Sequence, residues 1–156
     1  MSQGMNKDVL LKLELLSDPN LLCVVRATIE HLTELFGFQA PERRSVTLAV
    51  DEALTNILRH AYGGQSGRPI EILFRRIPQR SASKGGEGLE ILLSDRGPAV
   101  DPRKLRGRRL DEIKPGGLGL HFIRQSMDTV EFTRARGVNQ LRLIKYLQDA
   151  KEARHS

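Results

Sequence analysis

The sequence has one cysteine, no tryptophan and no long apolar run among its 156 residues. Because Cys23 stands alone, an intramolecular disulfide is excluded, and the four histidines show no metal-ligand spacing with it, which argues against structural zinc. No apolar run reaches the ~18 residues of a membrane-spanning helix, and the N-terminal residues lack the basic start, apolar stretch and cleavage site of a signal peptide. These absences predict a cytoplasmic protein without a membrane segment.

Aromatic residues are also scarce, at 4%, which argues against a surface that stacks nucleic-acid bases. Hydrophobic residues at 39% and charged residues at 28% are typical of a globular protein. The length predicts a single domain over residues 1–156, with a loosely held tail from about residue 148. The net charge of +6 favours an anionic partner, but nucleic acid, a membrane surface, a nucleotide and an acidic protein all meet that condition.

Hydrophobic periodicity divides the chain into helices and strands. Apolar residues at helical spacing predict helices over residues 19–36, 41–60 and 118–128, the first capped by Asp18 and ended by Gly37. Short apolar runs predict strands over residues 9–15, 70–77, 89–94, 130–134 and 140–147, the last two joined by a turn at residues 137–139. Residues 98–117 are rich in proline, glycine and arginine, which predicts a mobile loop.

Two polar residues share a face of the second predicted helix. Glu52 and Asn56 are four residues apart and lie close to the apolar stripe of that helix. A carboxylate there could take a proton or orient a water, and the amide oxygen beside it suits Mg²⁺, which prefers oxygen ligands. The same spacing also fits a helix with an ordinary polar edge, so the pair alone does not identify a site.

Two further features follow along the chain. Asp95 ends an apolar strand just before Gly97, where a carboxylate would accept a hydrogen bond from an exocyclic amine such as that of adenine; a plain turn is the alternative. Gly116, Gly117 and Gly119 precede an amphipathic helix, whose N-terminal N–H groups and dipole favour phosphate; a flexible connection is the alternative. In this order, the three features supply the metal and proton handling, the adenine recognition and the phosphate cradle of one ATP site.

Three segments also resemble the motifs of a known family. DEALTNILRHAYGG is similar to the N box, and SDRGPAVDP and PGGLGLHFIRQSMDTVEF are similar to the first and second glycine boxes, of the RsbW-type anti-sigma factor serine kinases in the histidine-kinase-like (GHKL) ATPase superfamily. The resemblance runs from about residue 10 to residue 147. It implies an α+β fold, a two-layer sandwich of the Bergerat type, with helices on one face of a mostly antiparallel sheet.

The resemblance implies roles for single residues and two cofactors, ATP and Mg²⁺. Glu52 corresponds to the general base, Asn56 to the Mg²⁺ ligand and Asp95 to the adenine-binding aspartate. Nucleotide binding is further implied for residues of the two glycine boxes, namely Gly97, Gly117, Leu118, Gly119 and Leu120.

The implied function is an ATP-dependent serine/threonine kinase that phosphorylates a small STAS-type anti-sigma-factor antagonist and sequesters a sigma factor. A homodimer is implied in the same way, and direct contact with nucleic acid or membrane is not expected. One alternative is an ATP-binding partner-switching module without phosphotransfer. A second, a basic nucleic-acid-binding domain, leaves the three boxes unexplained.

The segment 101–114 departs from a neutral composition, with six Lys or Arg against three Asp or Glu. It would fit a clamp on the triphosphate, a surface for an acidic partner or a solvated loop.

Overall fold

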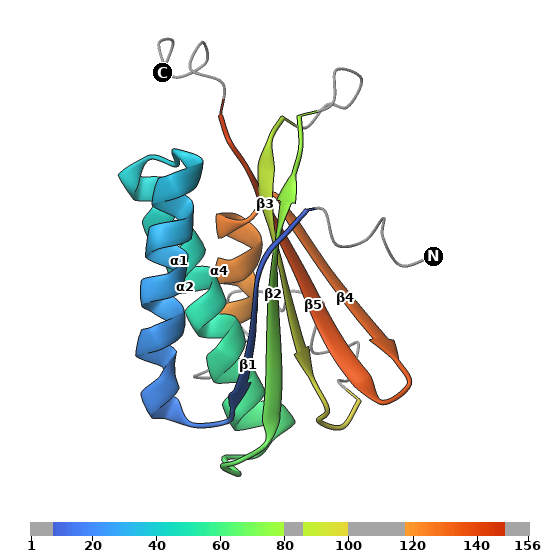
Figure 1. Ribbon diagram of the computed structural model, residues 1–156. Helices are drawn as coiled ribbons and strands as arrows, with labels where there is room; N and C mark the ends of the chain where they lie inside the picture. Colours follow the sequence, from blue (N-terminus) through green and yellow to red (C-terminus); the bar gives the residue numbers. More distant parts are fainter. Residues whose placement is uncertain (1–7, 80–85, 100–117, 149–156) are drawn as a thin grey trace.

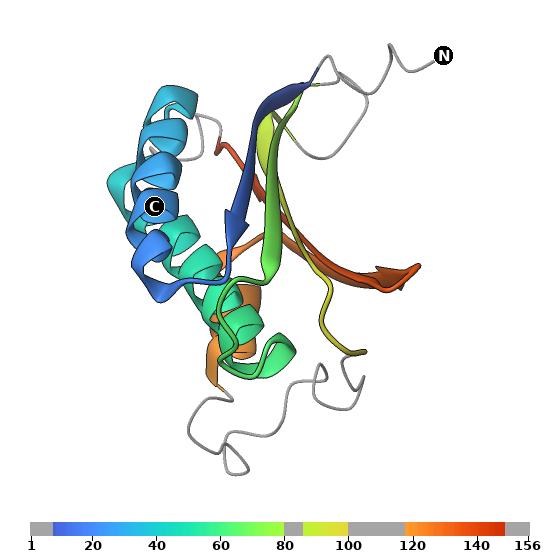
Figure 2. The ribbon, with the colours of Figure 1, turned by 60° about the horizontal axis from the view of Figure 1, so that its bottom comes forward.

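The computed structural model describes residues 8–79, 86–99 and 118–148, which form two layers, a β-sheet and a set of α-helices on one of its faces (Figures 1 and 2). The strands of this part of the chain are β1 (Val9–Leu16), β2 (Pro69–Ile77), β3 (Gly88–Asp95), β4 (Thr129–Ala135) and β5 (Val138–Tyr146). Its α-helices are α1 (Leu22–Phe36), α2 (Ala40–Asn56) and α4 (Leu118–Ser126). Each helix in these three ranges is too short or too polar to span a bilayer.

The sheet is antiparallel throughout, with the strand order β1-β2-β3-β5-β4. After α4 the chain forms the edge strand β4 and then returns through β5 to the side of β3. The register places Asp95, the last residue of β3, between Ile70 of β2 and Asn139 of β5. The end of β3 therefore lies between the beginnings of its two neighbouring strands.

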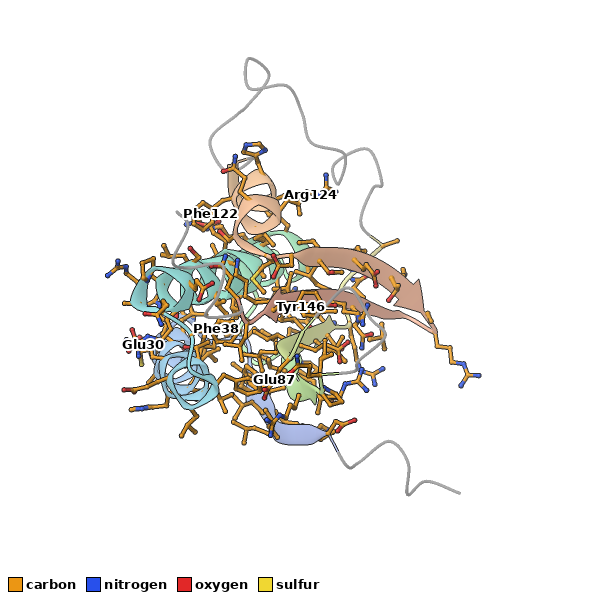
Figure 3. The ribbon with its side chains drawn as sticks, turned by 90° about the horizontal axis from the view of Figure 1, so that it is seen from above. Glu30, Phe38, Glu87, Phe122, Arg124 and Tyr146 are labelled. Atoms are coloured by element: carbon orange, nitrogen blue, oxygen red, sulfur yellow. The ribbon has the colours of Figure 1, made fainter. Side chains whose placement is uncertain are left out.

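Alternate residues of the strands face the helices and form the core. Figure 3 shows side chains filling the space between the two layers. α2 contacts both α1 and α4, so it occupies the centre of the helical layer. Burying one large side chain contributes about 1.5–3 kcal/mol, and this packing holds α2 in place over the sheet. Core residues that are at most 1% exposed include Ile29, Val46, Leu54, Ile72, Phe74, Ile91, Leu93, Ile123 and Leu143.

The first two predicted helices are confirmed, with local differences at their ends. A 3₁₀ turn, η1 (Pro19–Leu21), precedes α1, and the Asp18 carboxylate caps it by accepting a hydrogen bond from the N–H of Asn20 at 2.9 Å. α1 ends at Gly37, whose φ of 84° lies in the left-handed region that glycine tolerates best. α2 passes directly into a π-helical segment, η2 (Ile57–Ala61), so the helix reaches the predicted end with a wider last turn.

The turn of the last hairpin was predicted wrongly at residues 137–139. Arg136 and Gly137 have φ values of 52° and 77°, the pair of left-handed residues that a two-residue type I′ turn requires. Val138 and Asn139 therefore belong to β5, and Asn139 comes to lie opposite Asp95. The third helix is also shorter than predicted, because the N–H of Asp128 already bonds to the carbonyl of Ile144 in β5, at 2.9 Å.

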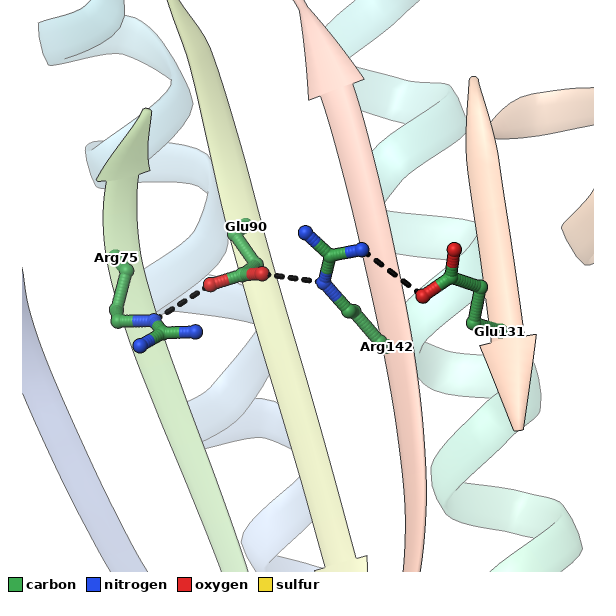
Figure 4. Close-up of polar contacts among 4 residues, drawn as sticks. All are labelled: Arg75, Glu90, Glu131 and Arg142. Carbon is green, nitrogen blue, oxygen red and sulfur yellow. Dashed lines mark hydrogen bonds and ion pairs between the residues drawn. The ribbon is translucent and has the colours of Figure 1, made fainter. Parts of the chain in front are cut away.

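The face of the sheet away from the helices carries a row of alternating charges (Figure 4). Glu90 of β3 accepts hydrogen bonds from Nε of Arg142 and Nε of Arg75, both at 2.5 Å, and Arg142 also donates to Glu131 at 2.9 Å. Burial alone would raise the pKa of the Glu90 carboxyl, but the hydrogen bonds from Arg142 and Arg75 outweigh it, so this pKa lies below its ordinary value. The row links β2, β3, β5 and β4 on the side opposite the core.

Candidate functional site

Glu52 and Asn56 lie one turn apart at the C-terminal end of α2. Both are half-buried, and neither side chain makes a hydrogen bond or ion pair with another residue in the described ranges. The α-helix gives way to the π-helical η2 immediately after Asn56, a distortion that is frequent at functional sites. A carboxylate and an amide oxygen are thus adjacent where the helix geometry changes, and their roles stay predictions.

The neighbouring carboxylate, Asp51, has a different position and use. Its two oxygens accept hydrogen bonds from Nε and Nη2 of Arg26 on α1, at 2.7 and 3.1 Å. This two-point contact between planar groups joins α1 to α2. Of the two adjacent acidic residues, Asp51 therefore has a structural partner, and Glu52 is the candidate for chemistry.

Asp95 sits at the end of β3 and is only 6% exposed. Its Oδ1 accepts two hydrogen bonds, from the N–H of Gly97 at 2.8 Å and from Nδ2 of Asn139 at 2.9 Å. Oδ2 accepts none from any residue that the structure describes. The turn thus fixes one carboxylate oxygen and leaves the other for a ligand, as recognition of an amino group requires.

The segment that follows α2 packs directly against this turn. The hydroxyl of Tyr62 donates to the carbonyl of Pro69 and accepts a hydrogen bond from the N–H of Arg96 at 2.9 Å. Gly97 lies so close to Ala61 that a Cβ on Gly97 would be 2.7 Å from both the Ala61 carbonyl oxygen and its Cβ. The chain that bears Glu52 and Asn56 is therefore in contact with the turn that bears Asp95.

The second glycine box is described only in part. Leu118, Gly119 and Leu120 form the first turn of α4, which packs on α2. Gly117 and the basic segment 101–114 lie outside the described residues, so the predictions made for them stay predictions. The packing of α4 on α2 nevertheless brings α4 next to the helix that bears Glu52 and Asn56.

Two side chains of the site were missed by the sequence analysis. Asn139 is completely buried and Arg134 is exposed, and both donate hydrogen bonds to the turn after Asp95. Tyr62 lies within the segment that resembles the N box, but the sequence analysis gave it no role. The signal that could have found Asn139 is the Arg136-Gly137 pair, which is compatible with a two-residue turn and places Asn139 inside the following strand.

A groove of about 940 Å³ lies beside the end of β3. Asp95 and Arg96 border it, together with residues 13–16 of β1 and the beginning of α1. Glu52, Asn56 and Gly97 do not line it. The groove therefore shares Asp95 with the site that the three motifs outline, but not Glu52, Asn56 or Gly97.

Residues 15–145 match the family described as the histidine kinase-like ATPase domain. The chain belongs to this family. A serine-protein kinase RsbW of Bacillus pumilus (strain SAFR-032) is 28% identical over 92% of this chain and 90% of its own length. Another RsbW, of Halalkalibacterium halodurans, is 30% identical over 80% of this chain and 75% of its own length. These relatives place the chain among the RsbW-type members of the family, as the three boxes predict.

Solved structures support the same fold. The SiaB-SiaC complex from Pseudomonas aeruginosa contains a chain that superposes with a TM-score of 0.61 at 12% identity, covering 88% of this chain and 89% of that one. The RsbU and RsbW domains of a Mycobacterium tuberculosis protein superpose with a TM-score of 0.58 at 15% identity, covering 88% of this chain and 33% of that one. The predicted α+β sandwich of the histidine-kinase-like ATPases is thereby confirmed.

Proposed function

We propose that the protein is an ATP-dependent serine/threonine kinase that phosphorylates a small STAS-type anti-sigma-factor antagonist and sequesters a sigma factor. The Asp95 carboxylate carries this proposal, because two donors hold its Oδ1 and no described residue occupies its Oδ2. The names of the RsbW relatives, which are serine-protein kinases, support a protein as the phosphate acceptor.

The base is recognised through Oδ2 of Asp95. An ionised carboxylate only accepts hydrogen bonds, so it attracts the 6-amino group of adenine and repels the 6-oxo group of guanine. The buried position of Asp95 raises the cost of a mismatch, because an unpaired polar group away from water is expensive. ATP is therefore preferred to GTP.

Mg²⁺ fits the residues present. The Asn56 side chain offers a neutral amide oxygen, and no residue in the described ranges bonds to it. Mg²⁺ is commonly held by few protein ligands together with substrate phosphates, so one amide beside a triphosphate is sufficient. When bound there, Mg²⁺ supplies charge neutralisation on the phosphates.

Glu52 acts on the acceptor protein. Its carboxylate takes the proton from the serine or threonine hydroxyl as that oxygen forms a bond to the γ-phosphorus. The bond from the γ-phosphorus to the β,γ-bridging oxygen breaks, and ADP leaves with the electron pair. The adjacent Asn56 keeps the proton acceptor and the metal ligand on the same face of α2.

The test separates binding from chemistry at Glu52. Glu52→Gln keeps the shape of the side chain and removes its basicity, so ATP affinity stays within a few-fold while phosphotransfer falls by about 100- to 10,000-fold. Affinity is measured by calorimetry, and transfer by incubating labelled ATP with candidate STAS-type antagonist proteins.

Asp51→Asn is the matched control. It alters the adjacent carboxylate, which pairs with Arg26, so it lowers stability and leaves the transfer rate close to that of the parent. A Glu52→Gln variant that transfers phosphate at the parent rate would refute the general-base role. Binding of ATP without transfer by the parent protein would instead identify a partner-switching module. Copurification with mass spectrometry tests the sigma factor, and the mass of the purified protein in solution shows whether the chain forms a homodimer.

A further inference from the structure

Asn139 is a fully buried polar side chain at the centre of the hydrogen bonds around Asp95. Its Nδ2 donates to Oδ1 of Asp95 at 2.9 Å, to the carbonyl of Pro98 at 3.1 Å and to the carbonyl of Gly97 at 3.2 Å. Its own Oδ1 accepts a hydrogen bond from Nη1 of Arg134 at 2.7 Å. Every polar atom of this side chain is therefore engaged, with one contact to Asp95 at the end of β3 and two to the turn that follows it.

The chemistry of the neighbours fixes which way the amide points. Three oxygen acceptors surround Nδ2, and a guanidinium faces Oδ1, so the flipped amide would set oxygen against oxygen and nitrogen against nitrogen. The same Nη1 of Arg134 also donates to the carbonyl of Gly97, at 3.0 Å. This second hydrogen bond holds the guanidinium in place as a donor that faces Asn139, which strengthens the preference for one orientation of the amide. The two side chains thus form one network that is anchored in the β4–β5 hairpin.

We propose that Asn139 is a positioning residue for base recognition, which holds the Asp95 carboxylate in the one orientation that offers Oδ2 to the adenine amino group. The inference rests on the proposed function, in which Asp95 binds adenine. Among the described residues, the N–H of Gly97 would then be the one donor left to Oδ1 of Asp95, so the carboxylate could rotate about its Cβ–Cγ bond or take a water in place of Nδ2. Adenine selectivity therefore depends on a residue that does not itself contact the base.

The expected signature is a change in selectivity rather than a uniform loss of binding. Without Asn139 the Asp95 acceptor is less well placed for an amino group, so ATP affinity falls. GTP, which gains nothing from that acceptor, is little affected. A residue with only a structural role would weaken both nucleotides together, because an altered fold impairs the phosphate and ribose contacts of both.

The experiment measures the ATP and GTP affinities of Asn139→Ala by calorimetry, well below its melting temperature. We expect the ratio of ATP affinity to GTP affinity to fall by about 10-fold, which is the loss of one hydrogen bond to a charged group. Gln140→Ala is the matched control: Nε2 of Gln140 bonds to Oγ of Ser94 at 3.2 Å, so it joins the same two strands one residue away. This control keeps the parent ratio.

A second variant covers the case in which Asn139→Ala does not fold. Arg134 is exposed, so Arg134→Leu leaves the core intact while it frees Oδ1 of Asn139, and we expect a smaller decrease in the same ratio, about 3-fold. An unchanged ratio in Arg134→Leu and in any folded Asn139→Ala overturns the inference. If Asp95→Asn also leaves ATP affinity unchanged, the proposed adenine role of Asp95 fails as well; if Asp95→Asn weakens ATP, only the role of Asn139 fails.

Discussion

Replacing Gly97 with alanine tests whether the turn after Asp95 depends on its close contact with the end of the π-helical segment. The added Cβ would lie 2.7 Å from the carbonyl oxygen and 3.0 Å from the carbonyl carbon of Ala61. Both are backbone atoms, so no side-chain rotation relieves the clash. Gly97 has no positive φ, and the cost therefore comes from space alone.

The size of the effect follows from the distance. An ordinary contact begins at 3.4 Å, so the turn or the helix end must move by roughly 0.7 Å. Overpacking of this kind costs about 1–3 kcal/mol of unfolding free energy. The movement also displaces Asp95, whose Oδ1 is bonded to the N–H of Gly97, and losing a charged hydrogen bond to adenine weakens ATP binding by about 10- to 150-fold.

Urea denaturation and calorimetric titration with ATP measure the two effects. Gly86→Ala is the matched control, because a Cβ there would lie 3.8 Å from the carbonyl oxygen of Leu147, an ordinary contact, and its unfolding free energy stays within about 0.5 kcal/mol of the parent value. If Gly97→Ala matched Gly86→Ala in both stability and ATP affinity, the close packing of the turn against Ala61 would have no functional consequence, and the reasoning would be refuted.

Three further predictions concern the same framework. Asp95→Asn weakens ATP by about 10-fold or more in calorimetry, since a charged acceptor is lost, and equal affinities of the parent for ATP and GTP would contradict adenine recognition. Tyr62→Phe removes the hydroxyl between Pro69 and the N–H of Arg96, and it lowers the unfolding free energy by about 1–3 kcal/mol in urea; an unchanged midpoint and slope would contradict this. Because the pKa of Glu90 is lower in the folded chain than in the unfolded chain, its contribution is present above the ordinary value of about 4.3 and is lost as the pH falls through the folded value. The parent therefore loses more stability than Glu90→Gln on acidification from about pH 5 to pH 3, as denaturation at each pH would show, and parallel curves would count against it.

The sequence was sufficient to predict which helices and strands form and which motifs they carry. Helices and strands are set by local periodicity, so the strands around Ile72 and Ile91 and the helix around Val50 appeared where the apolar residues recur. The pair of Glu52 and Asn56 was equally predictable, because residues four apart on a helix always share a face. The family followed from the order of three short motifs along the chain.

The tertiary structure alone decided how the turn after Asp95 is held. Asp95 meets Asn139 across 44 residues of sequence, and Arg96 meets Tyr62 across 34. The first contact depends on the register between β3 and β5, which a two-residue turn sets and which a shift of one residue would destroy. The second depends on how α2 and its π-helical extension pack on the sheet. Periodicity reports only which face of an element is apolar, so the partners that converge on Asp95 become visible only when the strands and helices have been assembled.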